Sequence, residues 1–142
     1  MNVREIMSKD VVCCTRTTSI PDVARMMVQH DCGSLPVVDK AGDRQVLVGM
    51  ITDRDIVVRM IAQNRDPMQL TVGDCMSPRV IAVSPEDDVE AAADVMREYQ
   101  VRRVPVQDAN GACCGMVAQA DLAEKTSKDT VASVVREVSQ PA

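Results

Sequence analysis

The sequence has almost no aromatic residues, with one Tyr, no Phe and no Trp among 142 residues. Because 46% of the residues are hydrophobic and ten are Met, we predict an aliphatic core in which Met fills irregular gaps. No apolar run approaches the roughly 18 residues of a membrane helix, and the N-terminus lacks the apolar stretch of a signal peptide. We therefore expect a cytoplasmic protein without a membrane partner.

An excess of positive charge is also missing. The formal net charge is −5 at pH 7, which argues against a nucleic-acid partner because phosphate binding needs a basic surface. The single histidine, His30, has no evident partner for catalysis, and the sequence contains neither a P-loop nor a G-x-G-x-x-G motif. We therefore predict that the protein is not an enzyme.

Six cysteines are present without a C-x-x-C motif. Adjacent residues of a strand point to opposite faces, so neither Cys13-Cys14 nor Cys113-Cys114 is suited to hold one metal ion. We predict reduced thiols that act as small hydrophobes, without a disulfide framework or a metal site. A redox sensor built on an exposed thiol stays open as a less favoured alternative.

An internal repeat organises the chain. A shift of 69 residues places the first half on the second, and the shift falls to 66 after a turn that is shorter in the second copy. Loops tolerate such changes in length. The matches include Val3 with Val72, Ser8 with Ser77, Ala24 with Ala93, Pro36-Val37 with Pro105-Val106, Gly49-Met50 with Gly115-Met116 and Asp55 with Asp121.

Each copy contains the same predicted elements. In the first copy, a short strand at 11–14 precedes a helix whose apolar residues recur at helical spacing. A hairpin follows, with strands at 35–38 and 46–51. Pro36 cannot donate a ladder hydrogen bond, so we expect its strand to be an edge strand or to have no partner at that position. A second helix begins near Thr52. We expect this helix to bury Ile56, Val57, Met60 and Ile61.

The predicted fold class is α/β (α+β), with two repeats of order β-α-β-β-α. A single unit of about 60 residues has a marginal core, so we expect the two to be related by a pseudo-twofold axis and packed through their sheets. We assign residues 1–66 to repeat 1, 67–128 to repeat 2 and 129–142 to a C-terminal helix and tail. The amphipathic stretch at 130–138 predicts that helix.

The most informative segment runs from Gly49 to Asp55, where a strand ends and a helix begins. Thr52 opens the helix, whose first turn offers free backbone N–H groups to a phosphate. The Asp55 carboxylate, three residues later, is placed to accept hydrogen bonds from the hydroxyls of a ribose. The alternative is a helix cap, because T-x-x-D approximates a capping box. The two roles are compatible.

The order of elements in both copies, with the segments GMITDRD, GSLPVV and RRVPV, resembles a tandem cystathionine-β-synthase-type (CBS) domain pair, or Bateman module. The resemblance extends from Val3 to about Lys125. It implies a non-catalytic regulatory module that binds an adenosyl ligand (AMP, ADP, ATP or S-adenosylmethionine) in clefts between its repeats and signals by conformational change. It also implies a homodimer and an effector protein as partners, with no required cofactor.

The resemblance also implies the residues that bind the nucleotide. Arg102 and Arg103 form the only adjacent cationic pair of the chain, and a guanidinium holds phosphate in a bidentate fork. The alternative is that these arginines pair with surface carboxylates. The full set of candidates is Thr18, Cys32, Gly33, Ser34, Thr52, Arg54, Asp55, Val101, Arg102, Arg103 and Asp121.

The second copy departs from this pattern at four positions. It loses a hydroxyl and gains a carboxylate near any bound phosphate, so we expect one competent site and one weak or altered site. A ligand-independent interaction or dimerisation module is the alternative function. The changes from the first to the second copy are Thr18 to Asp87, Thr52 to Ala118, Asp53 to Gln119 and Arg54 to Ala120.

Overall fold

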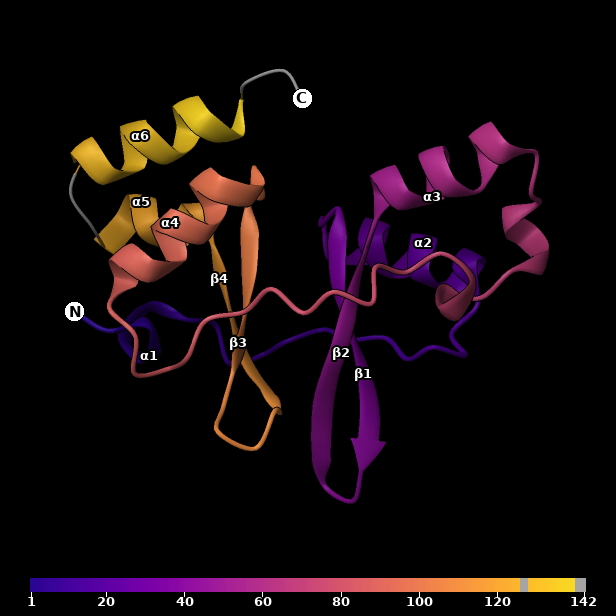
Figure 1. The fold of residues 1–142 in the computed structure, drawn as a ribbon, viewed down its shortest axis with the longest axis horizontal. Coiled ribbons are helices and arrows are strands. Elements are labelled where there is room, and N and C mark those ends of the chain that lie inside the picture. Colours follow the sequence, from indigo (N-terminus) through magenta and orange to yellow (C-terminus); the bar gives the residue numbers. More distant parts are fainter. Residues whose placement is uncertain (126–127, 140–142) are drawn as a thin grey trace. The chain divides into compact units, whose positions relative to one another are not determined.

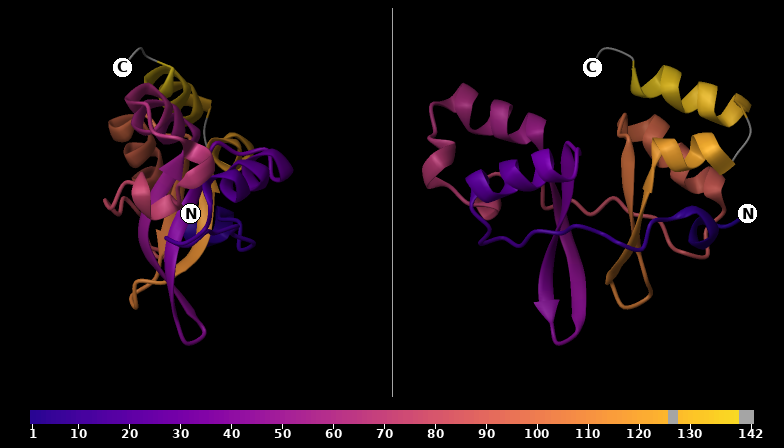
Figure 2. Two further views of the ribbon diagram at one scale, coloured as in Figure 1. Left: turned by 90° about the vertical axis from the view of Figure 1, so that its right-hand side faces the viewer. Right: turned by 180° about the vertical axis from the view of Figure 1, so that it is seen from behind.

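Each half of the chain builds one antiparallel hairpin with helices beside it (Figures 1 and 2), which confirms the mixed α+β class. The computed structural model describes residues 1–125 and 128–139. Their helices and strands are α1 (Val3–Ile6), α2 (Ile20–Gln29), β1 (Ser34–Ala41), β2 (Arg44–Thr52), α3 (Asp53–Arg59), α4 (Val89–Tyr99), β3 (Arg103–Gln107), β4 (Cys113–Ala118), α5 (Gln119–Lys125) and α6 (Lys128–Val138). Short 3₁₀ turns occupy Ile61–Gln63, Pro67–Gln69 and Val72–Asp74.

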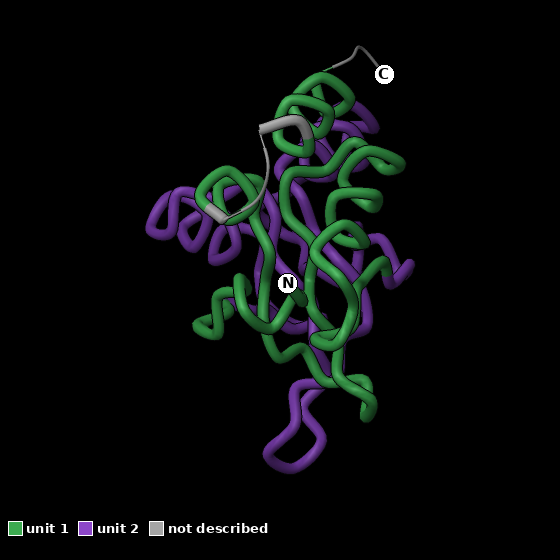
Figure 3. Tube along the Cα trace, turned by 90° about the vertical axis from the view of Figure 1, so that its left-hand side faces the viewer, with its two compact units in different colours: residues 1–11, 81–142 green, residues 12–80 purple. Residues whose placement is uncertain are grey.

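The chain divides into two compact units that combine segments of both repeats (Figure 3). Unit 1 contains residues 1–11 and 81–142, and unit 2 contains residues 12–80. The strands β1 and β2 form the sheet of unit 2, and β3 and β4 form the sheet of unit 1. The boundaries predicted from the repeat, at 66/67 and 128/129, stay a prediction.

Backbone pairing explains why the units differ from the repeats. In unit 1, Ser8 and Met116 of β4 exchange two backbone hydrogen bonds of 2.8 and 2.9 Å. In unit 2, Ser77 and Met50 of β2 exchange two bonds of 3.0 and 3.1 Å. Because Ser8 matches Ser77 in the repeat, the segment that begins each repeat completes the hairpin of the other repeat.

The strand predicted at 11–14 is wrong in extent, because the described structure gives this segment one β-bridge, which joins Cys14 to Val37 in parallel. The Cys14 N–H donates to the Pro36 carbonyl at 3.0 Å, and the Val38 N–H donates to the Cys14 carbonyl at 2.9 Å. The next bond of a parallel ladder would start from the backbone nitrogen of Pro36, which carries no hydrogen. Proline therefore removes the next hydrogen bond of the ladder on the side of Val12, and the matching Pro105 has the same effect in unit 1.

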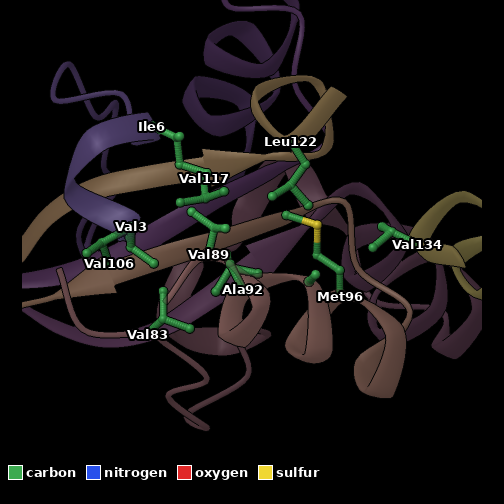
Figure 4. Packing of buried hydrophobic residues seen from close by; sticks show 12 residues of the cluster. Val3, Ile6, Val83, Val89, Ala92, Met96, Val106, Val117, Leu122 and Val134 are labelled. Carbon is green, nitrogen blue, oxygen red and sulfur yellow. The ribbon is translucent and has the colours of Figure 1, made fainter. Parts of the chain in front are cut away.

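Each unit has its own aliphatic core, as the composition predicts. In unit 1, Met96 of α4 extends towards Leu122 of α5 (Figure 4). The buried cluster of unit 1 contains Val3, Ile6, Val83, Val89, Ala92, Ala93, Met96, Val104, Val106, Val117, Leu122 and Val134. That of unit 2 contains Cys14, Ile20, Val23, Met27, Leu35, Val37, Ile51, Met60, Val72, Cys75 and Met76.

Helix α3 buries fewer residues than its apolar pattern predicts. It begins after Thr52, as expected, and Met60 is fully buried and Ile56 half-buried. The prediction that Val57 and Ile61 are buried is wrong, since both are exposed. A 3₁₀ turn replaces the helix after its seventh residue, so the buried stripe narrows to Ile56 and Met60.

Helix α6 confirms the helix predicted at 130–138. It packs against α4 and α5 (Figure 1), and its Val134 is fully buried in the core of unit 1. The last part of the predicted tail, 140–142, lies outside the described residues. Among the helices of the described ranges, none has the length and apolarity needed to cross a bilayer.

Candidate functional site

In unit 2, the start of strand β1 is tied to the first turn of helix α3. The Asp53 N–H donates to the Gly33 carbonyl at 2.9 Å, and Ser34 lies opposite Thr52 in the β1–β2 register. No loop intervenes, because Thr52 is both the last residue of β2 and the N-cap of α3 (Figure 1). Six candidate residues, Cys32, Gly33, Ser34, Thr52, Arg54 and Asp55, therefore form one group, which we call the unit 2 cluster.

Thr52 and Asp55 form a complete capping box. The Asp55 N–H donates to Thr52 Oγ1 at 3.0 Å, and the Thr52 N–H donates to Asp55 Oδ2 at 2.9 Å. The other carboxylate oxygen, Oδ1, lies 3.6 Å from Nε of Arg59. An ionised carboxylate has acceptor positions for about four hydrogen bonds, so the cap leaves Asp55 with capacity for ligand hydroxyls. The cap and the predicted ribose contact are thus compatible.

Asp53 belongs to the same cluster, although the sequence analysis did not select it. A Cβ on Gly33 would lie 2.9 Å from Oδ2 of Asp53, so a larger residue at position 33 would require the exposed Asp53 side chain to shift. The Arg54 side chain is exposed, and the backbone N–H of Arg54 donates to Oδ1 of Asp53 at 2.8 Å. The sequence feature that could have identified Asp53 as a candidate is its position directly after Thr52, in the first turn of the helix. The cluster therefore presents two carboxylates.

Unit 1 has the same arrangement, but only one of the two hydrogen bonds of the capping box forms there. The Gln119 N–H donates to the Arg102 carbonyl at 2.8 Å, and Arg103 lies opposite Ala118 in the β3–β4 register. The Ala118 N–H donates to Asp121 Oδ2 at 2.7 Å, but Ala118 has no hydroxyl to accept the return bond. Four candidate residues, Val101, Arg102, Arg103 and Asp121, are thus gathered in a group that we call the unit 1 cluster.

The two arginines of the unit 1 cluster keep their charges available. Arg102 is exposed and Arg103 is half-buried. Within the residues that the structure describes, neither forms an ion pair with a carboxylate. The alternative that they pair with surface Asp or Glu is therefore not the arrangement observed. Val101 packs against the core of unit 1, so its side chain serves the fold.

Thr18 is not joined to the unit 2 cluster by hydrogen bonds within the described residues. Its Oγ1 accepts the Thr15 N–H at 3.0 Å, and its carbonyl accepts the Val72 N–H at 2.9 Å. Asp87, the match of Thr18 in unit 1, accepts the Ser84 N–H at 2.9 Å in the same way. Both side chains stabilise the turn before a helix. A ligand contact of Thr18 stays a prediction.

Burial makes three of the six thiols poor nucleophiles. It raises the pKa of Cys14 to about 11, and it also raises the pKa of Cys75 and of Cys114. Because the thiolate is the reactive form, these residues suit a packing role better than redox sensing. Over residues 1–125 and 128–139, no three side chains of His, Cys, Asp or Glu come together as a metal-binding group.

The raised pKa of Cys14 predicts a loss of stability at alkaline pH. The unfolded thiol ionises around its ordinary pKa of 9.0, whereas the folded thiol stays protonated until about pH 11. Unfolding therefore releases a proton in this window, and the free energy of unfolding should fall by roughly 1 kcal/mol between pH 8 and 10. Urea unfolding at both pH values, for wild type and Cys14→Ala, measures this contribution. Equal falls in the two proteins would refute it.

Comparison with known proteins identifies the family. The sequence model of the CBS domain matches residues 3–62 and 72–128, and thus both copies of the repeat. The chain therefore belongs to the CBS domain family, with two CBS domains in tandem. The resemblance found in the sequence is confirmed.

Two bacterial relatives match over nearly their whole length. The CBS domain-containing protein YhcV of Bacillus subtilis is 35% identical over 139 residues, which cover 97% of this chain and 95% of YhcV. Hypoxic response protein 1 of Mycobacterium tuberculosis is 33% identical over 138 residues, which cover 97% of this chain and 94% of that protein.

Solved structures of similar proteins contain different bound groups. A CBS domain pair in complex with 5′-methylthioadenosine and S-adenosyl-L-methionine is 31% identical, with a TM-score of 0.74, over 87% of this chain and 94% of the other. A structure of Hypoxic Response Protein I with two coordinated zinc ions is 34% identical, with a TM-score of 0.76, over 89% of this chain and 100% of the other.

Proposed function

We propose that the chain is a non-catalytic regulatory module that binds an adenosyl ligand. The observation that carries this proposal is the hydrogen bond that ties the strand start to the helix start in each unit, from Asp53 to Gly33 and from Gln119 to Arg102. These bonds gather ten of the eleven candidate residues, all except Thr18, into two clusters. The likeness to a CBS domain pair in complex with 5′-methylthioadenosine and S-adenosyl-L-methionine supports the ligand class.

The two clusters differ in charge, and this difference suggests a division of ligands. The unit 2 cluster presents Asp53 and Asp55 with the exposed Arg54, which suits an uncharged or sulfonium-bearing ligand. In the unit 1 cluster, Arg102 and Arg103 outnumber Asp121, which suits a phosphate. We therefore assign 5′-methylthioadenosine and S-adenosylmethionine to the unit 2 cluster, and AMP, ADP or ATP to the unit 1 cluster. This assignment replaces the expectation from the sequence that a phosphate binds at Thr52 and that the second copy is the weaker phosphate site.

Ligand occupancy reaches an effector protein through a shift in populations. A ligand that binds one conformation of the module more tightly raises the population of that conformation, and an effector must prefer the same conformation for the signal to pass. The ligand-independent interaction module remains the competing function, and it predicts no response to any adenosyl compound.

Thermal unfolding of nucleotide-free protein with each ligand tests the proposal. A ligand at about 100 times its dissociation constant adds about 2.7 kcal/mol to the free energy of unfolding, a rise of several degrees in melting temperature. The variant Arg102→Ala/Arg103→Ala should lose the response to AMP, ADP and ATP and keep the response to 5′-methylthioadenosine. Because Trp is absent, absorbance at 260 nm reveals any carried-over nucleotide beforehand.

A matched control removes two positive charges at the exposed end of the β1–β2 hairpin. Lys40→Ala/Arg44→Ala changes net charge equally, and both residues are exposed and lie at the far end of the hairpin from Thr52. If this control loses the nucleotide response to the same extent, the effect comes from net charge and the assignment to the unit 1 cluster fails. If no compound shifts the melting temperature of the wild type, the proposed function itself fails.

A further inference from the structure

Arg59, the last residue of helix α3, joins the unit 2 cluster to a segment that is remote in sequence. Its Nε lies 3.6 Å from Oδ1 of Asp55, one turn earlier on the same helix. Its Nη1 donates to the backbone carbonyls of Cys75 and Met76, each at 3.4 Å. The pKa of the Cys75 thiol responds to both side chains, since after the larger effect of burial Asp55 raises it and Arg59 lowers it. One guanidinium therefore contacts the carboxylate and the remote backbone together, as the planar fork of arginine permits.

Residues 75–77, which we call the 75–77 segment, are also paired with strand β2. The Ser77 N–H donates to the Met50 carbonyl at 3.0 Å, and the Met50 N–H donates to the Ser77 carbonyl at 3.1 Å. Cys75 and Met76 are buried in the core of unit 2. Beyond this segment, the chain passes from unit 2 into unit 1 (Figure 3). A change at the cluster that reaches the 75–77 segment therefore reaches the part of the chain that leads out of unit 2.

The contact with Arg59 leaves Asp55 enough acceptor positions for a ribose. An ionised carboxylate offers about four of them. The Thr52 N–H uses one, at 2.9 Å from Oδ2, and Arg59 faces another at Oδ1. About two positions remain, which matches the pair of free hydroxyls on the ribose of 5′-methylthioadenosine. A ligand can therefore bind Asp55 without displacing Arg59, and a carboxylate that the ligand has ordered offers the guanidinium a fixed partner.

Unit 1 carries no arginine at the matching position. The shift of 66 residues places Lys125 on Arg59, although Asp121 still matches Asp55. A lysine ammonium is a point charge, and it lacks the fork with which a guanidinium holds two acceptors in one geometry. We therefore expect the coupling in unit 2 alone.

We propose that Arg59 is a positioning residue that couples the state of Asp55 to the order of the 75–77 segment. A ligand that fixes the carboxylate fixes the guanidinium, which in turn fixes the carbonyls of Cys75 and Met76. By reciprocity, a change that loosens the segment weakens the binding of the ligand. This inference rests on the proposed function, because it describes how ligand occupancy leaves the unit 2 cluster.

Amide hydrogen exchange of nucleotide-free protein, resolved by NMR spectroscopy, tests the coupling with and without saturating 5′-methylthioadenosine. The Ser77 amide reports on the segment. The matching Ser8 amide, which donates to the Met116 carbonyl at 2.8 Å, is the internal reference in unit 1. In the wild type, the ligand should slow exchange at Ser77 relative to Ser8 by about fivefold or more, the lower end of typical couplings between sites. Arg59→Gln should still bind the ligand and protect the Thr52 amide, but it should lose the slowing at Ser77.

Arg65→Gln is the matched control. Arg65 donates to the Asp74 carbonyl at 3.1 Å, so this change removes an equal charge and a bond of the same kind beside the 75–77 segment. In the described residues the carboxylate of Asp55 pairs with Arg59 and not with Arg65, so the ligand effect at Ser77 should persist. Arg59→Lys keeps the charge without the fork, and it should lose the ligand effect as Arg59→Gln does.

A double-mutant cycle of Asp55→Asn and Arg59→Gln in the ligand-free protein tests the same coupling without a ligand. Each single variant should speed exchange at Ser77, and the double variant should add little to either, because the two side chains act together. Additive effects overturn the proposal.

The ligand experiment separates this proposal from the proposed function. Ligand protection of Thr52 without slowing at Ser77 in the wild type overturns the coupling alone, and so does slowing that persists in Arg59→Gln or disappears in Arg65→Gln. If the ligand protects neither amide while the cycle is non-additive, the proposed function fails and the coupling through Arg59 stands.

Discussion

Asp55→Ala is expected to weaken the binding of 5′-methylthioadenosine by about 10- to 100-fold, because hydrogen bonds to a charged group contribute about 1.5–3 kcal/mol each. The Asp55 carboxylate uses Oδ2 for the Thr52 N–H at 2.9 Å and retains capacity for the hydroxyls of a ribose. Isothermal titration calorimetry at fixed salt measures the change. The response of the unit 1 cluster to AMP should survive, since Asp55 lies in unit 2.

Asp55→Ala also removes a helix cap, at a cost of about 1 kcal/mol, and this loss needs a matched control. Unit 2 contains a second capping box, in which Asp74 Oδ2 accepts the Thr71 N–H at 2.8 Å. Asp74 is exposed and outside the unit 2 cluster. Asp74→Ala should therefore lower the melting temperature to a similar extent without changing affinity. Equal affinities of the Asp55→Ala and wild-type proteins would remove Asp55 from the binding site.

Gly49→Ala is expected to destabilise the protein by about 3 kcal/mol or more, since overpacking that cannot relax is among the most costly changes. A Cβ at this position would lie 2.2 Å from the Ser77 carbonyl oxygen and 2.5 Å from Cε of Met76. The Ser77 carbonyl is fixed by its hydrogen bond from the Met50 N–H at 3.1 Å. Urea unfolding at neutral pH measures the loss of free energy.

Gly115→Ala, at the matching position of unit 1, should cost less, about 1–2 kcal/mol. There the nearest atom to a Cβ is Sδ of Met7 at 2.6 Å, and the Ser8 carbonyl oxygen is 3.1 Å away. A methionine side chain shifts more easily than a paired backbone carbonyl. If the two variants lose equal stability, or if Gly115→Ala loses more, then the contact with the Ser77 carbonyl does not explain the destabilisation by Gly49→Ala.

Much of the local structure could be predicted from the sequence. Helix α3 begins where the T-x-x-D pattern predicts, because Thr52 and Asp55 satisfy each other's backbone N–H groups without help from distant residues. The hairpins also follow from short apolar strands that flank a turn. The same argument failed at 11–14. Pro36, in a strand that is remote in sequence, has no backbone N–H to donate the next hydrogen bond of the ladder.

The clusters were only partly predictable. The pattern identified Thr52, Asp55 and the paired arginines, because each type of side chain suits a nucleotide chemically. It missed Asp53, whose closeness to Gly33 depends on a hydrogen bond between residues 20 positions apart. It also left open whether Arg102 and Arg103 are neutralised, since ion pairs depend on which carboxylates the fold brings near.

The sequence by itself determined that this protein is a tandem repeat with an aliphatic core, because repetition and hydrophobic period are properties of the chain alone. Only the tertiary structure decided which segment completes which hairpin, since Ser8 and Ser77 carry the same pairing groups and either strand offers partners. It also decided that α6 packs against α4 and α5 in unit 1, and that Val28 and Val57 of unit 2 are exposed. Burial depends on contacts between distant segments. An apolar pattern predicts which face of a helix can be buried, but it does not predict which segment covers that face.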